Sequence, residues 1–198
     1  ISWIKWEKKR EKVLNMFLSK LDLDKSSYDK LKNIIPDNEI EAITNLFVKS
    51  NLVFLQGGPG TGKSTLIINL ILKFLMDDNL SNIGLAAPTG KAAARLKESL
   101  NNQKIDIDKK NLNKIECQTL HRWIYNYLNR NGKLKYKLKE LDFFIIDEMS
   151  MVNIELIESV LNLLAKDCKI LLVGDANQLP PINNCSIWNY IFKNLKNK

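Results

Sequence analysis

The sequence has few cysteines and no long apolar run, and each lack argues against a class of protein. Its three cysteines lie far apart and form no Cys-x-x-Cys pair, which argues against a disulfide scaffold or a zinc site. No stretch reaches the roughly 18 to 20 uninterrupted apolar residues that a membrane-spanning helix needs. No secretory signal precedes the first predicted helix. We therefore expect a cytoplasmic protein that does not bind a membrane.

The remaining composition is that of an ordinary globular protein. Hydrophobic residues make up 45% and charged residues 26% of the chain, which excludes wholesale disorder. A length of 198 residues is enough for one α/β domain and a small appendage. The net charge of +8 is compatible with a polyanionic partner such as nucleic acid.

The hydrophobic pattern changes near Pro36. Before it, helical spacing predicts helices over 3–21 and 28–35, which we interpret as the end of an N-terminal helical domain, residues 1–35. After it, the pattern predicts strands at 52–56, 82–87, 141–146 and 169–173. Helices are predicted at 37–48, at 91–100, at 121–127 and at 153–165. A further helix is predicted after residues 57–64 and ends at about Met76. Polar loops are predicted at 101–116 and 129–139, the latter a basic loop or hairpin. This alternation predicts an α/β fold, a parallel sheet flanked by helices on both faces.

A glycine-rich run follows the first predicted strand and opens the next helix. It matches the phosphate-loop pattern G-x-x-x-x-G-K-[ST] at every position: Gly57, Gly58, Pro59, Gly60, Thr61, Gly62, Lys63 and Ser64. Glycines let successive backbone N–H groups point at a phosphate, and the helix N-terminus adds partial positive charge. Lys63 suits the β- and γ-phosphates, and the Ser64 hydroxyl suits Mg²⁺. The run therefore predicts a nucleotide site over residues 57–65, with Thr65 included.

Two acidic residues stand at the end of the apolar strand near residue 146. Asp147 is predicted to hold the Mg²⁺ shell, and Glu148 to orient or deprotonate an attacking water. The adjacent pair favours hydrolysis of a nucleoside triphosphate over transfer to a second small substrate. After the next strand, Gln178 is expected to hydrogen-bond the γ-phosphate and to lose that bond after hydrolysis. Taken alone, the segment around Gln178 would be interpreted as a solvated polar turn.

Five ordered segments carry a family resemblance: Gly57–Ser64, Ala87–Leu96, Thr119–Arg122, Ile146–Met151 and Gly174–Pro180. Together they resemble the RecD-like group of superfamily 1 DNA helicases, in particular the alpha subunit of exodeoxyribonuclease V. The resemblance covers about residues 36–188. It implies a RecA-like P-loop NTPase domain over residues 36–198, with ATP and Mg²⁺ as cofactors.

The resemblance also implies a function. The domain would be the first motor domain of a helicase that moves 5′ to 3′ on single-stranded DNA. It would act in recombinational repair with the beta and gamma subunits of exodeoxyribonuclease V. The catalytic residues would be Lys63, Asp147, Glu148 and Gln178.

The implied DNA contacts lie after the second strand and around the start of the short helix predicted at 121–127. The candidates are Pro88, Thr89, Gly90, Lys91, Thr119, His121 and Arg122. A helix N-terminus beside Lys91 attracts phosphate, although a solvated helix face is the alternative for Lys91 and Arg95. A structural role is the alternative for His121. For Trp123 and Tyr125 we expect core packing rather than base stacking.

Three features depart from the family pattern. Glu39 stands where a related helicase has a glutamine that reads adenine, which leaves selectivity for adenine open. Met149 replaces a small residue and is expected to fill space. A second RecA-like domain, which supplies arginines to the γ-phosphate, is not present in these residues. Loss of such an arginine costs on the order of 10³–10⁵ in rate. We therefore expect this chain to bind ATP–Mg²⁺ weakly and to hydrolyse it slowly.

Two other functions stay open from the sequence. One is a nucleotide-binding structural subunit without motor activity, against which the intact catalytic set argues. The other is a stand-alone helicase of the Pif-like or conjugative relaxase-linked groups, although Ala87–Leu96 favours the RecD-like group. A P-loop kinase or GTPase is disfavoured because no guanine-reading Asn-Lys-x-Asp segment is present.

Overall fold

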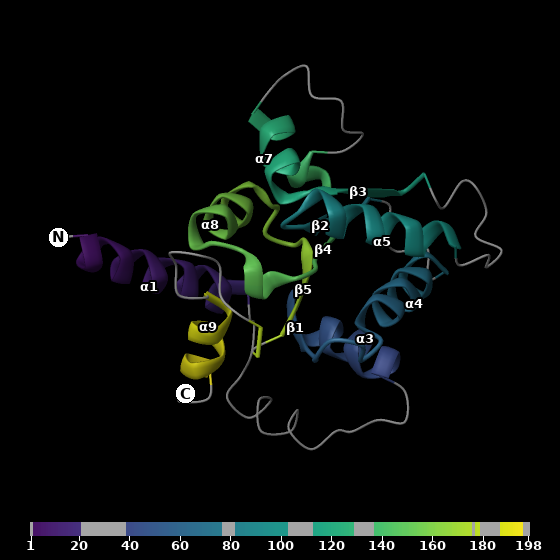
Figure 1. The fold of residues 1–198 in the computed structure, drawn as a ribbon, viewed down its shortest axis with the longest axis horizontal. Helices are drawn as coiled ribbons and strands as arrows, with labels where there is room; N and C mark the ends of the chain where they lie inside the picture. Colours follow the sequence, from purple (N-terminus) through teal and green to yellow (C-terminus); the bar gives the residue numbers. More distant parts are fainter. Residues whose placement is uncertain are drawn as a thin grey trace.

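The computed structural model describes residues 2–20, 39–76, 82–102, 113–128, 137–175, 177–178 and 187–195. The helix expected over 28–35, most of the segment 129–139 and part of the segment 174–180 lie outside the described residues. The elements, shown in Figure 1, are α1 (Ser2–Lys20), α3 (Glu39–Lys49), β1 (Leu52–Gln56), α4 (Lys63–Met76), β2 (Ile83–Ala87), α5 (Gly90–Asn102), β3 (Ile115–Thr119), α7 (Leu120–Leu128), η1 (Leu138–Glu140), β4 (Phe143–Ile146), η2 (Met149–Met151), α8 (Ile154–Leu163), β5 (Lys169–Gly174) and α9 (Ile187–Leu195).

The five described strands form one parallel sheet in the order β1-β5-β4-β2-β3. In the middle of the sheet, β4 is buried along its whole length, and β5 is buried except at its first residue. That burial on both faces explains why these strands are continuous apolar runs in the sequence. Because the strands are parallel, their carboxyl ends lie at one edge, where folds of this kind bind ligands.

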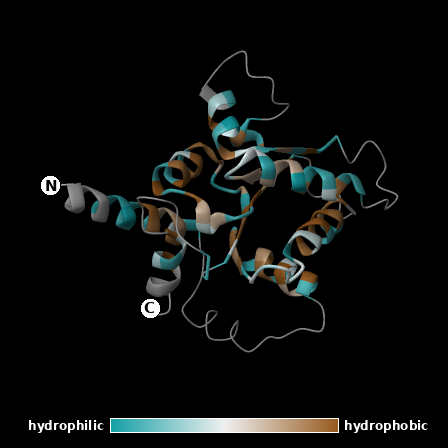
Figure 2. Cartoon of the chain, viewed as in Figure 1, coloured by the Kyte–Doolittle hydropathy of each residue, from teal (hydrophilic) through white to brown (hydrophobic). Residues whose placement is uncertain are grey.

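Helices cover both faces of this sheet (Figure 1). Alternate residues of β4 belong to different cores: Phe144 and Ile146 pack in one cluster, Phe143 and Ile145 in the other. The first cluster includes residues of α1, α7, α8 and α9, and the second includes residues of α3, α4 and α5. In Figure 2, α4 and α8 carry much of the hydrophobic colour, whereas α5 mixes hydrophilic and hydrophobic residues. The predicted α/β fold with helices on both faces is confirmed.

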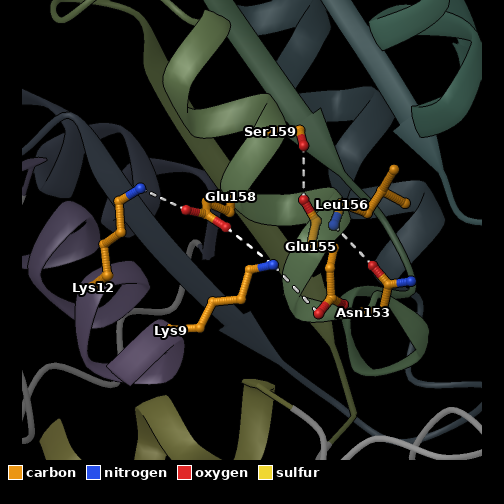
Figure 3. Close-up of polar contacts among 7 residues, drawn as sticks. All are labelled: Lys9, Lys12, Asn153, Glu155, Leu156, Glu158 and Ser159. Atoms are coloured by element: carbon orange, nitrogen blue, oxygen red, sulfur yellow. Dashed lines mark hydrogen bonds and ion pairs between the residues drawn. The ribbon is translucent and has the colours of Figure 1, made fainter. Parts of the chain in front are cut away.

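Helix α1 packs against α8 (Figure 3). Val13 and Phe17 of α1 are fully buried in the first core cluster. At the edge of this contact, Lys12 Nζ donates to Glu158 Oε1 at 2.6 Å. The helix therefore shares a core with the sheet. The assignment of residues 1–35 to the end of a separate domain stays a prediction.

Two described elements differ from the sequence prediction. Strand β3 begins at Ile115, inside the segment 101–116 that we expected to be a loop. All five of its residues are half-buried, and it pairs with β2 at the edge of the sheet. An edge strand of this kind has no buried apolar run, and its sequence, IECQT, therefore carries little strand signal. Helix α9 was not predicted.

Among the described residues, no helix combines the length and apolar character needed to cross a membrane.

Candidate functional site

The glycine-rich loop connects β1 to α4 at the carboxyl edge of the sheet. Gly60 and Gly62 have φ values of 73° and 80°, in the left-handed region that glycine adopts without steric cost. Gly57 N donates to Gly174 O at 3.1 Å, which fixes the start of the loop to the end of β5. Leu66 N donates to Gly62 O at 2.9 Å in the first turn of α4. The loop therefore has the strand–loop–helix context that the phosphate-loop pattern requires.

In the loop, the Lys63 side chain lies against the backbone, and most of the other side chains are exposed. Lys63 Nζ donates to Gly57 O at 2.6 Å and to Gly58 O at 2.5 Å, which keeps the ammonium over the loop. Ser64 and Thr65 are exposed in the first turn of α4. The other loop positions predicted from the sequence, Pro59 and Thr61, are also exposed. Phosphate groups bind readily at such a helix N-terminus.

The two acids follow β4, the central strand that pairs with β2. Asp147 N donates to Ala86 O at 2.9 Å, so the acidic turn is bonded to the end of β2. Glu148 N donates to Asp147 Oδ1 at 2.8 Å. Glu148 itself has φ 52° and ψ 39°, a left-handed conformation that costs a residue with a Cβ on the order of 1 kcal/mol. Such strain is typical of functional positions.

The electrostatics connect these acids to the loop. Burial raises the pKa of Asp147 above its usual value, opposed by the Glu148 N–H and the positive charge of Lys63. Burial and the neighbouring Asp147 raise the pKa of Glu148, opposed by the charges of Arg95 and Lys63. Lys63, Asp147 and Glu148 therefore act on one another electrostatically. A cation bound beside the two acids would relieve the cost of their charges.

Gln178 lies beyond β5 and contacts the acidic turn through a serine. Ser150 Oγ donates to Gln178 Oε1 at 3.1 Å. Gln178 N donates to Asp175 O at 3.3 Å, and the Asp175 side chain is buried. The structure thus brings Gln178 into contact with the turn that carries Asp147. Ser150 was not predicted as a site residue. Its position three residues after Asp147, close behind the two acids, is the sequence signal that could have indicated a role.

The predicted DNA-contacting residues after β2 form the start of α5. Thr89 Oγ1 accepts a hydrogen bond from Ala92 N at 3.2 Å and so caps the helix. Pro88 is half-buried, whereas Thr89, Gly90 and Lys91 are exposed. Arg95, one turn beyond Lys91, is also exposed. Because β2 pairs with β4, this segment lies beside the acidic turn.

The second predicted DNA-contacting set surrounds the start of α7. Thr119 Oγ1 accepts a hydrogen bond from Arg122 N at 3.3 Å, and His121 and Arg122 are exposed. Trp123 is buried, and its Nε1 donates to Leu85 O at 3.0 Å, as core packing predicts. The same prediction is wrong for Tyr125, which is 64% exposed because it lies on the outer face of α7. Met149 is fully buried and fills space as expected.

The donor set of the site fits a nucleotide with Mg²⁺. Within the described part of the chain, no group of three or more His, Cys, Asp or Glu side chains could hold a metal ion. Mg²⁺ differs from zinc in this respect, because it keeps several waters and binds one or two protein oxygens together with substrate phosphates. The Ser64 hydroxyl and the Asp147 carboxylate are oxygen donors of this kind.

The sequence of this chain matches the model of a known protein family. The model of a family described as "AAA domain" matches residues 39–184, which include the phosphate loop, both acids and Gln178. The chain belongs to this AAA domain family. The match therefore covers all five described strands and the whole candidate site.

The curated relatives include RecD subunits and a RecD2 helicase. The chain is 32% identical over 202 residues to the RecBCD enzyme subunit RecD of Buchnera aphidicola subsp. Schizaphis graminum, covering 93% of this chain and 33% of the relative. It is 36% identical over 137 residues to the ATP-dependent RecD2 DNA helicase of Deinococcus radiodurans, covering 67% of this chain and 16% of the relative. The chain thus spans about a third or less of these relatives. The predicted resemblance to RecD-like helicases is confirmed as distant homology.

A solved structure supports the fold. The UvsW helicase from bacteriophage T4 matches with a TM-score of 0.55 and 12% identity, covering 87% of this chain and 66% of the phage chain. At that identity the likeness concerns the fold alone. The family model and the curated relatives show separately that this AAA domain is related to RecD.

Proposed function

We propose that this chain is the first motor domain of an ATP-dependent DNA helicase of the RecD type. In this proposal it moves 5′ to 3′ on single-stranded DNA within an exodeoxyribonuclease V assembly with beta and gamma subunits. The observation that carries the proposal is the grouping of Lys63, Asp147, Glu148 and Gln178 around the carboxyl ends of β1, β4 and β5. The names and the aligned lengths of the RecD relatives support the choice of helicase type.

The residues of the site would divide the work of ATP hydrolysis. The N–H groups of the loop and the Lys63 ammonium would bind the β- and γ-phosphates. Ser64 and Asp147 would hold Mg²⁺, which when bound neutralises negative charge developing on the phosphates. Glu148 would orient the attacking water and accept its proton. A raised pKa makes the Glu148 carboxylate a stronger base than an exposed glutamate.

The DNA side of the proposal uses the segments after β2 and β3. Lys91 and Arg122 would contact DNA phosphates, since both are exposed near helix N-termini. The bond from Asp147 N to Ala86 O would connect the acidic turn to the strand that leads to Lys91. A movement of the acidic turn would then displace the segment that carries Lys91, and the reverse would also hold.

The test is nucleotide hydrolysis by the 198-residue chain with and without single-stranded DNA. We expect binding of ATP with Mg²⁺ and slow hydrolysis that DNA accelerates, because phosphoryl transfer without an arginine at the γ-phosphate is slower by on the order of 10³–10⁵. Lys63→Ala should abolish both binding and hydrolysis. Equal rates in the wild type and Lys63→Ala would remove Lys63 from the mechanism. ATP binding without any hydrolysis would instead favour the structural subunit that lacks motor activity.

A further inference from the structure

The hydrogen bond between Ser150 and Gln178 joins two loops of the site. Ser150 belongs to η2, directly after the two acids, and Gln178 follows β5. The strands that lead into these loops are neighbours, with Ile146 of β4 opposite Leu172 of β5. Ser150 Oγ donates to Gln178 Oε1 at 3.1 Å, and only 2% of Ser150 is exposed. The serine end of the bond is therefore shielded from water, which strengthens a hydrogen bond, whereas Gln178 is half-buried.

The direction of this bond determines which end of the amide is free to act. A glutamine side chain has one acceptor oxygen and two N–H donors on its nitrogen. Because Oε1 accepts from Ser150, the Nε2 donors are turned away from the serine. Those donors are the groups that a phosphate oxygen requires. An amide rotated by half a turn would present its oxygen to the anion and repel it.

Both partners are held by buried neighbours. Met149, beside Ser150, is fully buried in the core. On the other side, Asp175 is 2% exposed, and its Oδ1 accepts from Asn177 N at 2.9 Å. The Asp175 carbonyl accepts from Gln178 N at 3.3 Å. The serine and the glutamine backbone are thus anchored separately, and the side-chain bond sets the orientation of the amide between them.

We propose that Ser150 is a positioning residue that orients the Gln178 amide so that it distinguishes a nucleoside triphosphate from a diphosphate. This inference rests on the proposed function, in which Gln178 contacts the γ-phosphate. Ser150 acts through Gln178 and not on the nucleotide. Its loss therefore weakens triphosphate binding selectively, whereas a general loosening of the fold weakens both nucleotides.

The test compares two dissociation constants in the 198-residue chain, those of ADP and of a non-hydrolysable ATP analogue, each with Mg²⁺. The ratio of the two constants measures the preference for the third phosphate. We expect Gln178→Ala to lower this preference roughly tenfold, as for one hydrogen bond to a charged group. Ser150→Ala should lower it by several-fold with unchanged ADP affinity. The double variant should be no worse than Gln178→Ala, because the serine acts through the glutamine.

Two further variants keep the test decisive. Ser150→Cys has almost the volume of serine but only a weak donor, so it should reproduce the loss even if Ser150→Ala folds poorly. Ser159→Ala is the matched control: the Ser159 hydroxyl donates to Glu155 O within α8 (Figure 3) and not to Ser150 or Gln178, so the preference should not change.

Three results would contradict the proposed role of Ser150. A normal preference in Ser150→Ala and Ser150→Cys, beside a reduced one in Gln178→Ala, overturns it. So do losses that multiply in the double variant, or an unchanged preference in Gln178→Ala while ATP still binds. A wild-type chain that binds neither nucleotide overturns the proposed function itself, and this inference with it.

Discussion

Asp147 sits in surroundings that disfavour its own charge. Burial raises the pKa of this carboxyl above its ordinary value of 3.8, despite the opposing effects of the Glu148 N–H and Lys63. We expect Asp147→Asn to raise the free energy of unfolding at pH 7 by about 1 kcal/mol, a gain of the size that single stabilising substitutions commonly give. The amide oxygen can still accept the Glu148 N–H. Urea denaturation measures the difference, and binding of nucleotide with Mg²⁺ should be lost in the same variant.

The pH dependence of that gain gives its control. Below pH 3.8 the carboxyl is protonated in both the folded and the unfolded chain, so the wild type has no cost there. Because the folded-state pKa is raised, the cost develops as the pH rises from 3.8 to that raised pKa, and it is complete above it. The advantage of Asp147→Asn should be absent at the lowest pH and complete at neutral pH. An advantage of the same size at both ends would assign the effect to packing instead of charge.

At the scale of elements, the end of β5 and helix α9 are in close contact. A Cβ added to Gly174 would lie 2.9 Å from Cε2 of Trp188, closer than packed atoms normally approach. Gly174→Ala should therefore destabilise the fold by about 1–3 kcal/mol, as overpacking does. Gly90→Ala is the control, since nothing lies within 4 Å of the added atom. Equal unfolding midpoints in urea for the two variants would show that Trp188 can move aside.

The attachment of α1 gives a second prediction about an element. Phe17 is fully buried, whereas the side chain of Lys12 is 60% exposed beside Glu158. Phe17→Ala should lower the free energy of unfolding by about 3–5 kcal/mol. Lys12→Ala should lower it by less than about 1 kcal/mol, because solvent screens exposed ion pairs. If Phe17→Ala costs no more than Lys12→Ala in urea denaturation, α1 is not docked on α8 in solution.

Elements were predicted accurately from the sequence where its local patterns were strong. The strand over 52–56 and the loop after it were predicted closely, because an apolar run and a glycine motif agree there. Ile115–Thr119 was missed because edge pairing with β2 needs no apolar run. The Ser150–Gln178 contact could not be predicted either, since it depends on β4 and β5 being neighbours. Strand order is a property of the whole sheet, and no local pattern records it.

At the scale of the whole molecule, the net charge of +8 bears on the proposed binding of DNA. Affinity for single-stranded DNA should fall as salt rises, since each phosphate contact releases counterions. Lys91→Gln should reduce the slope of log affinity against log salt by about 0.7, the contribution of one contact to a single strand. Lys166→Gln is the matched control, because this exposed lysine precedes β5 at the opposite edge of the sheet. Fluorescence anisotropy over a salt series measures both slopes, and equal slopes would remove Lys91 from the interface.

The strand order also determines when the nucleotide loop can form during synthesis. Strand β1 pairs with β5, the last described strand to leave the ribosome, and Gly57 is bonded to Gly174 at the end of that strand. A nascent chain that ends before residue 169 lacks this neighbour, so its β1 is left without the partner that anchors the loop. Contacts so distant in sequence form slowly. The loop that is translated early is therefore among the later parts of the domain to acquire its native shape.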